Sequence, residues 1–349
     1  MKIAQVAPLC EAVPPKFYGG TERVVANLCN ALVELGHDVT LFASSESRTR
    51  ARLVPVRDQA IRLDATPLKS ELAAHLGMLY EVHRRHKQFD ILHFHIEMLH
   101  FPAFEAQAHK TVTTLHGRLD MKDYPQFYAR WDQFGLVSIS DAQRLPLRHA
   151  NWLRTVPHGI SAELFPFQAR TDGGYLAFLG RISPEKRPDV AIRLARRAGL
   201  PLKIAAKVDR GDAHYFETAV KPHLQEPQIE WVGEIDDSRK AEFLGNASAL
   251  LFPIDWPEPF GLVMIEAMAC GTPTIAWNRG AVPEIIEPGV SGFIVDSEAE
   301  AEEAIARIPA LNRLAVRRAF ERSFTASVMA KSYLDVYRHL LYRPAARPA

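Results

Sequence analysis

Short apolar runs alternate with helix-like segments along the chain, and they fall into two series. In the first series, strands are predicted at 2–8, 37–44, 89–96, 110–116, 135–140 and 153–157. In the second, strands are predicted at 175–180, 201–206, 229–233, 248–253, 273–277 and 292–296. Apolar residues recur at helical spacing between many of these runs. The pattern predicts an α/β protein with a parallel, doubly wound sheet in each half.

The two series are separated by a stretch of turn-forming residues without periodicity, HGISAELFPFQARTDGG (158–174). We therefore expect a first domain over 1–168 and a second over 169–325. A further periodic segment, 326–342, predicts a C-terminal helix.

Composition and charge narrow the classes of partner. Hydrophobic residues make up 47% and charged residues 24% of the 349 residues, which is typical of soluble globular proteins. The formal net charge of +1 gives no electrostatic case for nucleic acid. Three cysteines and a start that leads directly into a strand predict a cytoplasmic protein. No apolar run approaches the ~20 residues that span a bilayer, and the basic run HRRHK (83–87) reads best as a solvated helix end, so peripheral membrane contact is not indicated.

The most informative run is EPFGLVMIEAMACGTP, which begins at Glu258. Its apolar spacing predicts a helix that ends before Gly271. The backbone N–H groups of Gly261, Leu262 and Val263 would then lie at the helix amino end, where unpaired amides and the helix dipole favour a phosphate. Glu266, about one turn further in, would reach hydroxyl groups beside that phosphate. The alternative is an amphipathic helix with two solvated glutamates.

The stretch from residue 252 to residue 296 resembles the signature region of family 4 retaining glycosyltransferases (glycosyl transferases group 1). The resemblance implies the GT-B fold, with two Rossmann-like domains facing each other across a cleft. It also implies that Glu258 contacts the sugar of a nucleotide-sugar donor, UDP- or GDP-linked, and that Glu266 holds the ribose. The acceptor would bind the first domain, and the helix 326–342 would return to pack on that domain.

A second informative run, GRISPEKRPDVAIRLARRAG (180–199), leads from a strand into a helix. Arg181 and Lys186 lie in the connecting loop, and the resemblance implies that they neutralise the departing diphosphate. The alternative is a surface loop with ordinary basic residues. Gly19 and Gly20 precede a predicted helix and resemble the glycine-rich loop that faces the donor, although two glycines are often only a turn.

The remaining candidates lie at predicted strand ends. The resemblance implies catalytic roles for His116, Arg181, Lys186 and Glu258, and places His95 and Asp120 near the acceptor. It implies donor contacts at Gly19, Gly20, Arg181, Lys186, Gly233, Glu258, Phe260, Gly261, Leu262, Val263 and Glu266. No D-x-D motif occurs, and fixed cations with a helix end can replace a metal ion, so neither a metal nor another cofactor is expected.

The predicted activity is retaining, metal-independent transfer of a hexose-type sugar to a hydroxyl group. The acceptor, whether a small molecule, a glycan or a lipid-linked compound, is not specified by the sequence. A sugar-nucleotide 2-epimerase would share the architecture. A non-catalytic nucleotide-sugar binding protein would share the binding residues.

Overall fold

The computed structural model describes residues 1–16, 19–171 and 174–342, which form two compact units. The first unit comprises Met1–Gly159 together with helix α13 (Ala326–Tyr342), and the second comprises Ile160–Thr325. The sequence places the domain boundary after residue 168, and the second compact unit begins at Ile160. Ile160 already pairs with the end of that unit, because its amide donates to the carbonyl of Phe324 at 3.0 Å. None of the described helices is long and apolar enough to span a membrane.

The sheet of the first unit has seven parallel strands in the order β3-β2-β1-β4-β5-β6-β7. The strands are β1 (Lys2–Val6), β2 (Asp38–Ser44), β3 (Arg52–Arg57), β4 (Ile91–Phe94), β5 (Thr111–Thr114), β6 (Gly135–Ser138) and β7 (Trp152–Thr155). Six of them are those predicted, and β3 was missed. This edge strand reads RLVPVR and is only half-buried, so its proline and two arginines hide the apolar pattern.

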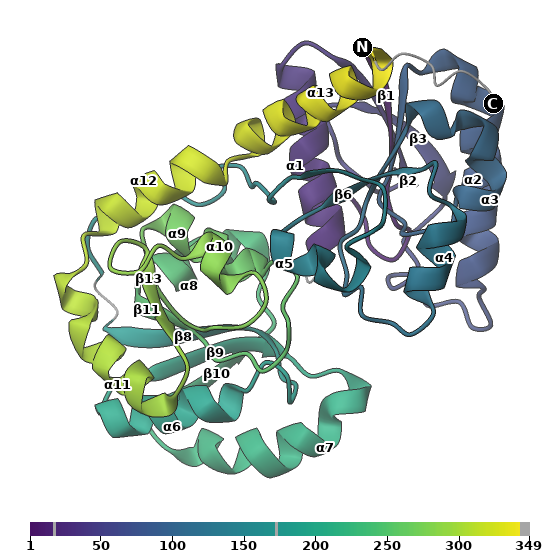
Figure 1. The fold of residues 1–349 in the computed structure, drawn as a ribbon. Coiled ribbons are helices and arrows are strands. Elements are labelled where there is room, and N and C mark those ends of the chain that lie inside the picture. The colour runs from purple at the N-terminus through teal and green to yellow at the C-terminus, as the bar shows by residue number, and fades with distance from the viewer. Residues whose placement is uncertain (17–18, 172–173, 343–349) are drawn as a thin grey trace. The chain divides into compact units, whose positions relative to one another are not determined.

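Helices cover both faces of this first sheet (Figure 1). One face carries α1 (Gly20–Glu34) and α13, which pack on each other. The other carries α2 (Glu71–Arg85), α3 (Phe101–Phe104) and α4 (Tyr124–Arg130), whose aromatic and aliphatic side chains share a buried core with β1 and β4. The short α5 (Asp141–Arg144) follows β6. Because both faces are covered, the strands read as continuous apolar runs.

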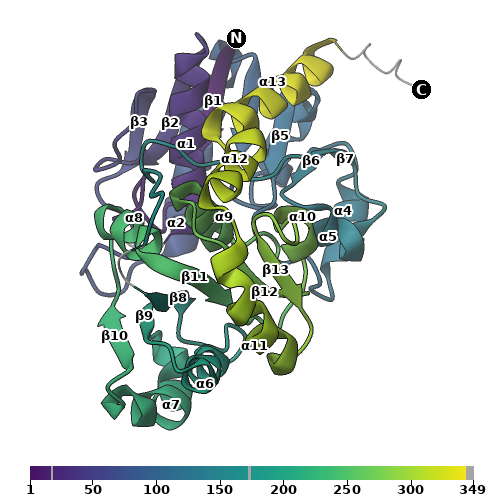
Figure 2. The same ribbon diagram turned by 90° about the vertical axis from the view of Figure 1, so that its left-hand side faces the viewer.

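The second sheet has six parallel strands in the order β10-β9-β8-β11-β12-β13 (Figure 2). They are β8 (Tyr175–Arg181), β9 (Leu202–Lys207), β10 (Ile229–Gly233), β11 (Ala247–Phe252), β12 (Thr274–Trp277) and β13 (Gly292–Val295), as predicted to within a residue or two. The helices are α6 (Pro188–Ala198), α7 (Ala213–Tyr215), α8 (Asp237–Gly245), α9 (Leu262–Cys270), α10 (Val282–Ile285), α11 (Glu298–Arg307) and α12 (Arg313–Ser323). The sheet lies between α6 with α11 on one face and α8 with α9 on the other.

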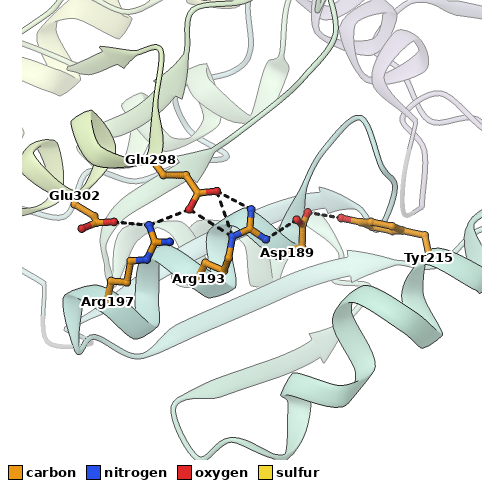
Figure 3. A network of polar contacts seen from close by, with 6 residues as sticks. All are labelled: Asp189, Arg193, Arg197, Tyr215, Glu298 and Glu302. Carbon is orange, nitrogen blue, oxygen red and sulfur yellow. Dashed lines mark hydrogen bonds and ion pairs between the residues drawn. The ribbon is translucent and has the colours of Figure 1, made fainter.

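A chain of ion pairs fixes α6 to its neighbours (Figure 3). Arg193 of α6 pairs with Asp189 at 2.8 Å and with Glu298 of α11 at 2.6 Å. Tyr215 of α7 donates to Asp189 at 2.5 Å. The network also includes Arg197 and Glu302, which pair at 2.7 Å. These contacts hold α6 against α7 and α11.

In each sheet the strand order reverses at one place. The reversal lies between β1 and β4 in the first sheet and between β8 and β11 in the second. Loops that leave neighbouring strands at such a point diverge and leave a crevice at the carboxyl edge of the sheet, where open α/β proteins bind their ligands. The loops after β1, β4, β8 and β11 are therefore the places to look for a site.

Candidate active site

In the second unit, the loops after β8 and β11 bring together two of the predicted residues. Lys186 follows β8, Glu258 follows β11, and the ammonium group of Lys186 forms an ion pair with the Oε2 atom of Glu258. The same oxygen accepts a hydrogen bond from the indole Nε1 of Trp256 at 2.9 Å. The two charged side chains are only 12% and 10% exposed. Such a shielded pair acts more strongly on a nearby charge than a solvated pair would.

Aromatic rings and a backbone bond fix this pair. The Nζ atom of Lys186 lies 5.4 Å from the ring centroid of Phe252 and 5.1 Å from that of Trp256, within the range of cation–π attraction. The amide of Asp255 donates to the carbonyl of Glu185 at 2.9 Å, which ties the two loops together. The lysine is therefore held in place from both loops, and sequence reasoning had not identified the tryptophan.

Gly280, which sequence reasoning also missed, packs directly against the backbone of Glu258. Gly280 has φ +55°, and a Cβ atom there would lie 2.2 Å from the carbonyl oxygen of Glu258. That oxygen accepts a hydrogen bond from the amide of Ala281 at 2.9 Å. Only glycine allows this approach.

Helix α9 begins where the sequence predicts. Gly261 caps its amino end in the left-handed conformation, with φ 88° and without a side-chain capping bond, and Leu262 and Val263 form the first turn. This is the arrangement in which helix amides can receive an anion. Phe260, by contrast, is only 3% exposed and packs edge-on against Phe324, with ring centroids 6.2 Å apart. Its side chain belongs to the core.

The second glutamate of the motif is buried within α9. Glu266 is 1% exposed, and its Oε1 atom lies 3.1 Å from the ammonium group of Lys240 in α8. Lys240 was not predicted, because a lysine on a polar helix carries no signal of its partner. A buried carboxylate with a lysine beside it is a polar site prepared for hydroxyl groups.

Two further donor-site candidates lie at the same edge of the sheet but apart from the pair. Arg181 ends β8, and its guanidinium is surrounded by the carboxylates of Glu185, Asp209 and Asp212 at 2.8, 3.7 and 4.0 Å. Gly233 ends β10, two strands away from β8, with φ +75°.

In the first unit, the loops after β4 and β5 bring the two predicted histidines together. The Nδ1 atom of His95 and the Nε2 atom of His116 are 2.9 Å apart, and Nε2 of His95 lies 2.8 Å from Oε1 of Gln5 in β1. The ring of His158 stacks on that of His116, with centroids 5.2 Å apart. Burial lowers the pKa of His116 to about 3, and burial with neighbouring histidines lowers the pKa of His95 well below its usual range. Both rings are neutral near pH 7.

The other predicted residues of the first unit have simpler surroundings. Asp120 is exposed and forms a bidentate pair with Arg118 at 2.6 Å, which holds the pKa of that carboxyl below its usual range. Gly19 caps α1, Gly20 begins it, and a Cβ atom on Gly19 would lie 2.7 Å from Cβ of Pro15. The glycine is therefore explained by close packing in the loop after β1.

Comparison of the sequence with known proteins identifies the family to which the chain belongs. A model described as "Glycosyl transferases group 1" matches residues 161–318, and one described as "Glycosyltransferase Family 4" matches residues 18–164. A phosphatidyl-myo-inositol mannosyltransferase of Mycolicibacterium smegmatis is 26% identical over 97% of this chain and 93% of its own length. A D-inositol 3-phosphate glycosyltransferase of the same species is 31% identical over 52% of this chain, and the match spans 45% of that relative.

A solved structure agrees with these matches over the full length. AviGT4, a glycosyltransferase involved in avilamycin A biosynthesis, is 25% identical, with a TM-score of 0.76 and coverage of 98% of both chains. The two family models together account for most of the chain and meet near the boundary between its two units. The chain therefore belongs to the family 4 glycosyltransferases of group 1, and it is a glycosyltransferase with the GT-B architecture.

Proposed function

We propose that this glycosyltransferase moves a hexose-type sugar from a UDP- or GDP-linked donor to a hydroxyl group, with retention of anomeric configuration and without a metal ion. The observation that carries the proposal is the shielded Lys186–Glu258 pair, which lies at the strand-order reversal of the second sheet. The amino end of α9, which begins at Leu262, follows Glu258 in the same loop. A cation, a carboxylate and helix amides in one place suit a diphosphate with a sugar attached.

The roles follow from the chemistry of each group. The ammonium of Lys186 and the amides of residues 261–263 would meet the diphosphate, so that negative charge that develops on the leaving group finds fixed donors. Glu258 would then accept hydrogen bonds from sugar hydroxyls, and Glu266 from the ribose. In the unliganded chain Lys186 is paired with Glu258. When the donor binds, its diphosphate would become a second anionic partner of the lysine, and the ammonium group would at no stage be buried without a partner.

The bond changes balance without a covalent enzyme intermediate. The acceptor oxygen bonds to the anomeric carbon on the face that the diphosphate leaves, and the bond from that carbon to the phosphate oxygen breaks. The proton of the acceptor hydroxyl passes to the departing phosphate oxygen. The histidines of the first unit do not need to act as bases, in accord with the low pKa of His116.

The names of the relatives suggest the acceptor. Both mycobacterial relatives are named for inositol-containing compounds, one of them a lipid. A cyclic polyol is therefore the first compound class to examine, in free and in substituted form. We place the acceptor on the first unit, beside His95 and His116.

The decisive experiment combines product analysis with one matched pair of variants. Wild-type protein is incubated with UDP-, GDP- and ADP-sugars and a polyol panel, with and without EDTA, and the anomeric configuration of any product is read by NMR. Lys186→Met should lower kcat/KM by about 10²- to 10³-fold, the usual effect of removing one donor to a developing negative charge. Lys203→Met is the control, since Lys203 also forms an ion pair, with Glu230 at 3.1 Å, but lies near the amino end of β9.

Each part of the proposal would be refuted by a different experimental result. Near-normal transfer by the Lys186 variant would remove the assigned role of the cation. Loss of activity in EDTA would contradict metal independence, and an inverted product would contradict retention. An epimerised donor, or nucleotide-sugar binding without a new linkage, would indicate one of the two alternative functions.

A further inference from the structure

The first unit contains a pocket of about 620 Å³ at the reversal of its strand order. Its lining comes from the loops after β1, β4 and β5 and from the first turns of α1 and α2. Apolar groups such as Leu72 and Ile96 form part of the wall, and the polar groups include Glu71, Glu97 and His116. A pocket of this size, apolar with a few polar groups, suits a single sugar-sized ring.

Glu97, which lines this pocket, has an unusual backbone conformation. It has φ 54°, one of three described non-glycine residues with positive φ. The backbone N–H groups of Gly117 and His116 act on its carboxyl group and oppose the rise that burial causes in its pKa. Its Oε2 atom is buried and has no hydrogen-bond partner in the described residues. Backbone strain that holds a buried, unsatisfied carboxylate oxygen is the kind of feature that collects at functional sites.

The histidine network leaves a second unsatisfied acceptor on His116, a residue that also lines the pocket. The amide nitrogen of Gln5 donates to the hydroxyl of Tyr337 at 3.1 Å, so the Gln5 oxygen faces His95 and accepts from its Nε2–H. Because His95 is neutral, its Nδ1 atom carries a lone pair and accepts from Nε2–H of His116. The remaining nitrogen of neutral His116, Nδ1, is therefore also an acceptor, and it is buried without a hydrogen-bond partner in the described residues.

The charge of the lining points in the same direction. Glu71 and Glu97 both line the pocket, and no lysine or arginine of the described residues does. The guanidinium of Arg118, next to Gly117 in sequence, makes a bidentate pair with Asp120. Phosphate groups carry only acceptors and negative charge at neutral pH, and proteins bind them with arginine, lysine or backbone N–H donors. This pocket offers the opposite set, two acceptors and two carboxyl groups, of which Glu97 is partly ionised near pH 7 because burial raises its pKa to about 7.

We propose that the pocket binds the acceptor as a neutral polyol or sugar, whose hydroxyl groups donate to Oε2 of Glu97 and Nδ1 of His116, and that it excludes phosphorylated acceptors. The inference rests on the proposed function, because it specifies the acceptor of that reaction. Glu97 is then an acceptor-binding residue that sets specificity, and His116 fixes the position of a second hydroxyl. Both relatives are named for inositols that carry a phosphate, one as a monoester and one within a phosphatidyl group, and this chain would differ from both.

The test uses matched neutral and phosphorylated compounds with the full chain. Binding of myo-inositol, D-inositol 3-phosphate, glucose and glucose 6-phosphate is measured by ligand-detected NMR at millimolar concentration in the presence of UDP or GDP, and transfer to each is measured with the active donor. We expect the neutral member of at least one pair to bind and to react at least about tenfold better than its phosphorylated partner. A preference for the phosphorylated member, or binding of neither neutral compound, overturns the inference.

A variant assigns the effect to Glu97. Glu97→Gln keeps the side-chain shape but replaces one acceptor oxygen by an amide donor, so the KM for the acceptor should rise about tenfold while the KM for the donor stays unchanged. The exposed Glu105→Gln is the control in the same unit. An unchanged acceptor KM in the Glu97 variant also overturns the inference. Failure of the proposed function is distinct, since it would appear as normal transfer in the Lys186 variant whatever the acceptor.

Discussion

Replacement of Glu97 by glutamine should change how the stability of the first unit depends on pH. Burial raises the pKa of Glu97 from the ordinary 4.5 to about 7, against the opposing hydrogen bonds from the backbone N–H groups of Gly117 and His116. Tyr124 and Tyr128 of α4 face the same carboxyl, and burial followed by the charge of Glu97 raises their pKa values, so they stay neutral. In the folded chain the carboxyl therefore keeps its proton over a pH range in which the unfolded chain has lost it.

The size of the effect follows from the two pKa values. A raised carboxyl pKa gives stability that is fully present below pH 4.5 and is lost as the pH rises through about 7. At about 1.4 kcal/mol per pH unit, the loss amounts to up to about 3 kcal/mol. Glutamine has nearly the same shape and never ionises. The Glu97→Gln variant should therefore gain stability over the wild type by up to that amount between pH 4.5 and pH 8.

The assay must report on the first unit alone. Urea unfolding followed by pulsed hydrogen exchange of β4 and β5 peptides meets this need at several pH values. Glu105→Gln, which removes an exposed carboxyl in the same unit, should give a pH-independent difference from the wild type. If the Glu97 variant also differs from the wild type by a constant amount, or loses stability relative to it at high pH, Glu97 does not titrate as the structure indicates.

Two other substitutions test the geometry. Gly280→Ala should abolish most transfer, because the new methyl group would lie 2.2 Å from the carbonyl oxygen of Glu258 and displace that backbone. The control is Gly289→Ala: Gly289 has φ +77° and no atom within 4 Å of the added Cβ, so this variant should lose only about 1–2 kcal/mol of stability and keep its activity. Equal activities of the two variants would refute the role of Gly280. Tyr337→Phe removes the hydroxyl that lies 2.8 Å from His93 and should destabilise the first unit by about 1–3 kcal/mol for each buried group left without a partner, measured as faster hydrogen exchange in α13. Wild-type exchange rates there would contradict the role of the buried bond.

The strand pattern could be predicted because parallel strands covered on both faces are continuous apolar runs. Helix ends were equally readable, since Gly199 and Gly271 end α6 and α9 in the left-handed conformation that glycine favours. The edge strand β3 was missed because one exposed side removes the pattern. For Phe260 the local pattern did not show where the side chain lies, and only the structure places it in the core against Phe324.

The amino-acid sequence by itself determined the order of the strands other than β3, the family, and which charged residues occupy the loops after β8 and β11. These properties depend on neighbours in the chain, through apolar spacing and backbone preference. Only the tertiary structure decided that Lys186 meets Glu258, 72 positions away, and that Glu97 and His116 keep buried acceptors without hydrogen-bond partners in the described residues. Those facts arise where the strand order reverses and distant loops converge, because ion pairing and desolvation depend on distances in space that no local pattern records.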